Sequence, residues 1–282
     1  MRLLNSSWIQ RPLLAAVLGA VSACGGGQTS VAKVEMKDFD AARYLLDYAE
    51  SSTAILKPET DSLDALGDEL RVTRTGTARR DLERRVAAGK LKEAMAAPTP
   101  KEARLLRNEA NKLLRQSKKG ERDSFHLAES EFLELWSAWL GGADDTERMA
   151  TAYTENRQDA LELYTLAWAI RGEAAYAHKR WSPAEEAFRF LVGQVEHPLY
   201  AYGLYRTAAV HNAHGEPKEA KAAYTEASEM GCRRGVSAAT QEAALFAAQA
   251  LDIAGRQDPD GVVRPASCPV GGREPPKSLD DI

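Results

Sequence analysis

The sequence predicts an all-α protein built from successive helical hairpins, and three observations support this prediction. Apolar residues recur at helical spacing in almost every segment of the chain. Short segments rich in Gly, Pro or polar residues separate the helical ones, and no run of useful length alternates apolar and polar residues as a half-buried strand does. A stretch of two helices also recurs after 36 residues, since Ala184 and Ala220 occupy equivalent places. We therefore expect about eleven helices.

The first predicted helices fall within residues 37–120, which we expect to form an N-terminal helical region. The segment 38–50 carries its apolar residues on one face, and the segment 61–70 repeats that pattern with three leucines. A basic helix is predicted over residues 78–95. "TPKE" at residues 99–102 combines a hydroxyl cap, a proline at the first helical position and a Glu three residues after the cap, which predicts the start of a further helix.

The predicted basic helix contains a cluster of arginines at Arg79, Arg80, Arg84 and Arg85. A solvated helix face is the simpler interpretation, because long charged side chains usually remain in water. Contact with lipid head groups or with an acidic partner is the alternative.

The second predicted region, residues 121–255, holds the repeated hairpins. Residues 166–198 and 202–232 form two equivalent units, each with two helices joined by a short turn. Residues 125–157 are expected to form a degenerate hairpin of the same kind before them, and residues 237–255 a capping helix after them. Such an array usually needs three or more units and a cap to bury its faces.

The two equivalent units share their spacing of large and small residues. The residues Trp168, Gly172, Ala184 and Phe188 of the first unit correspond to Leu204, Ala208, Ala220 and Tyr224 of the second. This arrangement resembles the tetratricopeptide repeat, whose period is about 34 residues. Small residues would let the two helices of a hairpin approach closely. "SPAE" at residues 182–185 is interpreted as a capping box for the second helix.

The resemblance to the tetratricopeptide repeat implies a concave groove formed by the first helix of each hairpin, where a partner peptide or helix would bind. The positions that would face this groove are Leu166, Glu173, Tyr176, Tyr202, Tyr205 and Asn212. Tyrosines on such a surface give contacts that suit an extended peptide or a helix. The other large aromatic residues are instead expected to lie in the core: Trp136, Trp168, Trp181 and Phe188.

The N-terminus resembles the signal peptide of bacterial lipoproteins. Two arginines precede a short apolar segment, which is below the ~20 residues needed to cross a bilayer and ends in "VSAC" at residues 21–24. The resemblance implies that residues 1–23 are removed, that Cys24 is lipidated and that residues 24–36 form a flexible tether. An ordinary secretory signal beside a free cysteine is the alternative.

The same resemblance implies an outer-membrane location, because Gly25 rather than Asp follows Cys24. The folded domain would then face the periplasm. Cys232 and Cys268 would be an even pair in an oxidising compartment, where a disulfide and two free thiols are the alternatives. The Pro-rich residues 256–282 are expected to be a disordered tail, apart from any tie at Cys268.

Charge and motifs narrow the function classes. The chain holds 37 Lys+Arg and 41 Asp+Glu, and its first 23 residues contain two arginines and no acid, so the rest carries a net charge of −6. Nucleic acid is not expected as a partner, since it calls for a basic surface. We predict no catalytic residues, no cofactor and no metal: "HNAH" at residues 211–214 lacks a third ligand, and the sequence has no phosphate loop or nucleophile elbow.

These features together predict a non-enzymatic adaptor or scaffold, tethered to the membrane through its lipid. Its partners would be other envelope proteins, and it would support the assembly of a secretin, a pilus, a motility complex or an outer-membrane complex. The alternatives are an activator of a cell-wall enzyme that acts on peptidoglycan, such an enzyme itself, or a protein that binds a small ligand.

Overall fold

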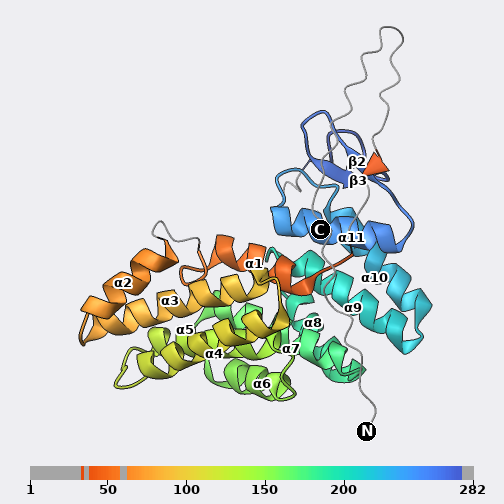
Figure 1. Cartoon of the computed structure of the whole chain (residues 1–282). Helices are drawn as coiled ribbons and strands as arrows, with labels where there is room; N and C mark the ends of the chain where they lie inside the picture. The colour runs from red at the N-terminus through yellow and green to blue at the C-terminus, as the bar shows by residue number, and fades with distance from the viewer. Residues whose placement is uncertain (1–32, 35–37, 58–61, 275–282) are drawn as a thin grey trace. The chain divides into compact units, whose positions relative to one another are not determined.

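The computed structural model of the chain describes residues 33–34, 38–57 and 62–274 (Figure 1). This part of the chain is mostly helical, with eleven α-helices and three short strands. The predicted all-α class is therefore confirmed at that coarse level. The predicted signal peptide 1–23, the lipidated Cys24 and most of the tether lie outside the described residues. None of the helices in the described ranges is both long and apolar enough to cross a membrane.

The first four helices are α1 (Ala41–Ser52), α2 (Leu63–Val72), α3 (Thr77–Ala96) and α4 (Pro100–Ser117). Helix α3 packs along α4 on one side and against α2 on another. The capping residue predicted for α4 is present, since the Thr99 hydroxyl accepts a hydrogen bond from the Glu102 backbone N–H at 3.2 Å. Helix α1 contacts α7 and α11, and it also meets α3 through an ion pair between Glu50 and Lys92 at 3.1 Å (Figure 1).

The remaining helices follow one another as hairpins: α5 (Ser124–Leu140), α6 (Thr146–Asn156), α7 (Leu161–Ala177), α8 (Trp181–Val192), α9 (Tyr200–His214), α10 (Pro217–Met230) and α11 (Ala238–Ala250). Each helix from α5 to α11 packs against the next one along the chain. The three segments predicted as hairpins each contain two of these helices, and α11 follows at the position predicted for the capping helix.

Two glycines explain how closely the helices of this stack approach. A Cβ atom at Gly172 of α7 would lie 2.5 Å from the Phe188 ring of α8. A Cβ atom at Gly203 of α9 would lie 2.8 Å from the Leu191 Cβ of α8. Real Cβ atoms do not come this close to other atoms, so a larger residue at either position would push α8 away from its neighbour.

The capping box predicted at residues 182–185 is wrong. Helix α8 already begins at Trp181, and its N-cap Arg180 makes no side-chain capping bond. Trp181 packs edge-on against Tyr176 of α7, with ring centroids 5.5 Å apart. Packing against the preceding helix therefore accompanies the start of α8 in place of the expected hydroxyl cap.

The disordered tail predicted for residues 256–282 is also wrong over residues 256–274, and residues 275–282 lie outside the described part. Three antiparallel strands form a sheet in the order β1 (Lys33–Val34), β2 (Gly255–Gln257) and β3 (Val263–Pro265). Cys232 and Cys268 form a disulfide, which ties the tail to the end of α10. The tail is thus ordered by pairing with segments that are distant in the sequence.

Buried charges fix the same C-terminal segment. The Asp258 carboxylate is almost fully buried, and it accepts hydrogen bonds from Arg256, from Arg264 and from the Gly271 backbone N–H. Burial opposes ionisation of this carboxyl group, but these donors hold the pKa of Asp258 below its usual value. An ionised aspartate at the centre therefore holds the turn after β2, strand β3 and the loop after Cys268 together.

Candidate functional site

The groove predicted on the first helices of the hairpins is filled by the chain's own helix α1. Leu166 and Tyr202 are fully buried, and Glu173 is 7% exposed. Tyr176 and Tyr205 are half-buried, and only Asn212 of the predicted set is exposed. The prediction that these residues line an open groove is therefore wrong for Leu166, Glu173 and Tyr202. We call this surface of α7, α9 and α11 under α1 the covered face.

Aromatic side chains join helix α1 to the covered face. The Tyr44 ring stacks on Tyr202 with centroids 4.9 Å apart and an interplanar angle of 12°. Phe39, just before α1, meets Tyr205 edge-on at 4.9 Å and Phe246 of α11 edge-on at 5.0 Å. Such contacts add specific geometry to the burial of large apolar area. Tyr202 and Tyr205, which the sequence assigned to a partner, thus contact the N-terminal part of the same chain.

Hydrogen bonds from two tyrosines one turn apart also hold α1. The Tyr44 hydroxyl donates to the Ala239 carbonyl oxygen of α11 at 2.9 Å. The Tyr48 hydroxyl donates to the Glu162 Oε2 of α7 at 2.6 Å and lies 3.1 Å from the His197 Nε2. Burial, followed by the bond to Glu162, raises the pKa of Tyr48 far above its usual range. Tyr44 and Tyr48 are therefore neutral, hydrogen-bonded side chains that join α1 to α11 and α7.

A buried ion pair lies at the centre of the covered face. The Arg206 guanidinium donates to both carboxylate oxygens of Glu173, at 2.5 Å and 2.8 Å, and the Tyr202 hydroxyl donates to Glu173 at 2.6 Å. The same guanidinium lies 4.4 Å from the Tyr176 ring centroid. All strong charges in this cluster are thus satisfied inside the protein, which is the arrangement of a structural ion pair rather than of a reactive group.

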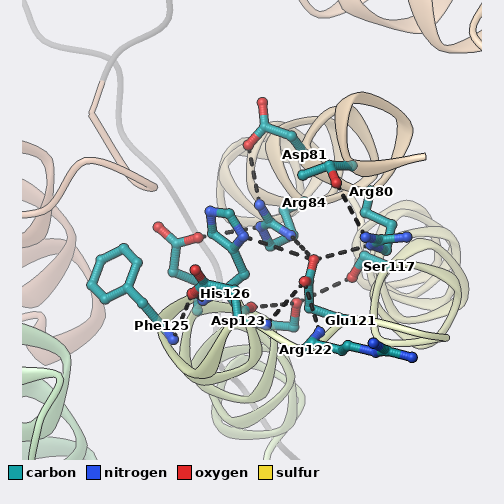
Figure 2. A network of polar contacts seen from close by, with 12 residues as sticks. Arg80, Asp81, Arg84, Ser117, Glu121, Arg122, Asp123, Phe125 and His126 are labelled. Carbon is teal, nitrogen blue, oxygen red and sulfur yellow. Dashed lines mark hydrogen bonds and ion pairs between the residues drawn. The ribbon is translucent and has the colours of Figure 1, made fainter.

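A second buried network joins α3 to the start of α5 (Figure 2). Arg84 of α3 has a fully buried side chain, with its Nη1 3.5 Å from Glu121 and its Nε 3.2 Å from the Glu129 Oε2. Arg80 also pairs with Glu121, at 3.0 Å. The prediction of a solvated arginine face is therefore wrong for Arg84. The sequence contains an indication that Arg84 is buried. Arg84 precedes the buried Leu91 by seven residues, which places both on the same face of α3.

The two carboxylates of this network have opposite pKa shifts. Burial opposes ionisation of Glu121, but the backbone N–H groups of Asp123 and Arg122, together with Arg80, lower its pKa to about 2. Burial raises the pKa of Glu129 to about 7, and Arg84 offsets only part of that shift. Glu121 is therefore a permanent anion, whereas Glu129 changes its charge near neutral pH.

Glu129 also lines an open pocket of about 270 Å³, which we call the acidic pocket. The pocket lies where α1 ends, between α5 and the first residues of α7. Its walls are formed by Ser52, Thr53, Ala54, Ile55, Phe125, Glu129, Asp159, Ala160, Leu161, Glu162 and Leu163. Phe125 and Leu161 are 51% and 73% exposed, and the Phe125 ring points away from the buried network (Figure 2). Sequence reasoning did not identify this pocket.

A larger cavity of about 650 Å³ lies between α11 and β3. Its walls are mainly apolar and include Leu245, Phe246 and Val263, together with Arg233 and Glu242. Burial raises the pKa of Glu242. The opposite charges of this cavity stand in contrast to the acidic pocket, where the described lining carries carboxylates and no Lys or Arg.

The histidines of "HNAH" bond to a single carboxylate. His211 Nδ1 and His214 Nδ1 lie 2.6 Å and 3.0 Å from the two oxygens of Glu216. Within the ranges that the structure describes, no group of three or more His, Cys, Asp or Glu side chains is arranged to hold a metal ion. His211 and His214 thus connect the end of α9 to the start of α10.

Comparison with protein-family models, with curated proteins and with solved structures finds no match to this chain. The structure buries Leu166, Glu173 and Tyr202 and packs Tyr202 and Tyr205 against Phe39 and Tyr44. It places Tyr176 against Arg206, forms the Cys232–Cys268 disulfide at the tail, and leaves the acidic pocket open.

Proposed function

We propose that this chain is a non-enzymatic adaptor of the bacterial envelope, anchored through a lipidated Cys24 and built from tetratricopeptide-like hairpins. It binds other envelope proteins and supports the assembly of a larger machine, such as a secretin, a pilus, a motility complex or an outer-membrane complex. The observation that carries this proposal is the stack of hairpins α5 to α11. The acidic pocket, with its exposed apolar residues, stays open where α1 ends.

The proposed location rests on two features. The "VSAC" segment after a basic start and a short apolar core supports lipidation at Cys24 and a position at the outer membrane, facing the periplasm. The disulfide between Cys232 and Cys268 fits an oxidising compartment, because such bonds are rare where thiols are kept reduced.

The choice of an adaptor over an enzyme rests on the titratable groups of the covered face. Glu173 and Arg206 neutralise each other, and both side chains are only 8% exposed. A catalytic acid or base must instead reach a substrate. Phe125 and Leu161, by contrast, are exposed apolar residues on the rim of one pocket, where a partner protein can contact both.

Crosslinking in intact envelopes tests this proposal. Purification of the crosslinked chain should return the same one or few envelope proteins each time, and a Cys24→Ser variant should return them in smaller amounts because it loses its anchor. Repeated recovery of no partner would contradict the proposal. So would cleavage of purified peptidoglycan by the chain alone. Stimulation of a peptidoglycan synthase by the chain would instead favour the role of enzyme activator.

A further inference from the structure

The acidic pocket is shaped by three separate segments of the chain. The end of α1 and its following turn form one wall, α5 forms another, and the residues at the start of α7 form the third. Its volume of about 270 Å³ is just below the 300–1,000 Å³ typical of sites for drug-sized ligands. The pocket is therefore large enough for one large side chain of a bound protein.

The charges around the pocket are strongly one-sided. Glu129, Asp159 and Glu162 line it, and the described lining residues include no Lys or Arg. Arg84 reaches Glu129 from beneath the pocket, and His197 lies 3.4 Å from Glu162. Asp159 is exposed and makes no ion pair with another described residue. An approaching cation would thus find in Asp159 a carboxylate that forms no ion pair with the described residues, although Arg157 lies near enough to interact with it electrostatically.

The rim of the pocket is apolar. Phe125 offers an exposed ring on the α5 side, and Leu161 is 73% exposed on the α7 side. A guanidinium can stack on an aromatic ring while it donates two hydrogen bonds to a carboxylate, whereas an ammonium group donates as a point charge. The Phe125 ring and the carboxylates can therefore bind the guanidinium of an arginine, and the exposed Leu161 can contact an apolar residue that follows it.

We infer that the acidic pocket is the partner-recognition site of this adaptor, and that it binds an arginine side chain of a partner protein, with the adjacent apolar residue of the partner on Leu161. This inference rests on the proposed adaptor function for the nature of the partner. The pocket itself and its charge are independent of that function.

Saturation-transfer NMR with two matched dipeptides tests the inference directly. The probe is acetyl-arginyl-leucine amide, and its control carries citrulline, which has the same shape without the charge. We expect the full chain, purified in detergent, to bind the arginine peptide at least fivefold more tightly than the citrulline peptide. Equal binding of the two peptides, or binding of neither, would overturn the inference.

Substitutions in the acidic pocket test whether the arginine peptide binds there. Asp159→Asn and Leu161→Ser change exposed side chains and should fold normally, and each should weaken the arginine peptide about fivefold, as the loss of one exposed charge pair or apolar contact predicts. Glu109→Gln and Leu105→Ser alter exposed residues of α4 outside the pocket lining and should leave binding unchanged. Unchanged binding in both pocket variants would overturn the inference.

The two proposals fail in distinguishable ways. If crosslinking recovers an envelope protein but the arginine peptide does not bind, the adaptor function stands and the pocket inference is wrong. If the peptide binds at the pocket but no envelope protein is ever recovered, the pocket inference stands and the adaptor function is wrong.

Discussion

The covered face and the acidic pocket contain similar chemistry in different settings. Each has a buried carboxylate beside a buried arginine, Glu173 with Arg206 in one and Glu129 with Arg84 in the other. On the covered face, the Phe39 ring just before α1 lies 5.4 Å from the Arg206 guanidinium, and both oxygens of Glu173 accept hydrogen bonds from Arg206. Beyond the end of α1, Glu129 stays next to an opening, and burial raises its pKa to about 7. The position of α1 thus separates a structural site from one that can accept a ligand.

The largest expected effect is the loss of stability when the buried Glu173–Arg206 ion pair is broken. Glu173→Gln leaves the Arg206 charge buried without its counter-ion, so we expect the free energy of unfolding to fall by about 3–5 kcal/mol in urea denaturation. Glu186→Gln is the matched control, because Glu186 pairs with Arg171 but its side chain is 61% exposed. A loss below ~1 kcal/mol is expected there. Equal losses of stability in the two variants would contradict the distinction between the buried Glu173–Arg206 pair and an exposed ion pair.

Replacing one phenylalanine on each surface compares how much packing contributes to stability at the covered face and at the acidic pocket. Phe39→Ala should lower the free energy of unfolding by about 2–3 kcal/mol and speed hydrogen exchange in α9, because Phe39 joins α1 to Tyr205 and Phe246. Phe125→Ala should change stability by less than about 0.5 kcal/mol, since Phe125 is 51% exposed. If Phe125→Ala proved as destabilising as Phe39→Ala, the acidic pocket would not be an open surface.

Glu121 provides a test in acid. Its folded-state pKa of about 2 lies below its unfolded value, so the stability that it contributes is complete above about pH 4.5 and is lost as the pH falls toward 2. Thermal unfolding should show wild type more stable than Glu121→Gln by about 2 kcal/mol at pH 6, and the difference should shrink to near zero at pH 2. A constant difference across that range would show that Glu121 is not ionised by the network.

The pH dependence of peptide binding should be the smallest effect. Glu129 faces Asp81 and Arg84 of α3, Glu121 before α5, Asp123 and His126 at the start of α5, and Asp159 and Glu162 across the pocket. An arginine favours the ionised carboxylate, so its affinity should be up to about tenfold weaker at pH 6 than at pH 8. Glu129→Gln should flatten that dependence, whereas Asp159→Asn should retain it. An unchanged pH profile in Glu129→Gln would contradict the role of Glu129.

Local patterns predicted the helices well. The basic helix predicted over residues 78–95 lies within one residue of the bounds of α3, and Thr99 caps α4 as expected. These features depend on residues a few positions apart, which a sequence displays directly. The predicted cap at Ser182 failed because Trp181 begins α8 and packs on the preceding helix instead.

Non-local contacts could not be predicted in the same way. The apolar face of segment 38–50 indicates that it must be buried, but not that it covers α7 and α11 and so occupies the expected groove. The tail carries Pro and Gly signals typical of disorder, yet β2 pairs with β1 from the other end of the chain. The acidic pocket combines residues from three distant segments, so no motif marks it.

Site-specific photocrosslinking in living cells tests the central claim most directly. A photoreactive amino acid in place of Leu161 should crosslink an envelope protein, because this side chain lies at the open rim. The same amino acid in place of Tyr205, which contacts Phe39 on the covered face, should not. The claim is that α1 occupies the covered face and that the partner binds at the acidic pocket. Crosslinks from position 205 but not from position 161, or from neither position, would contradict it.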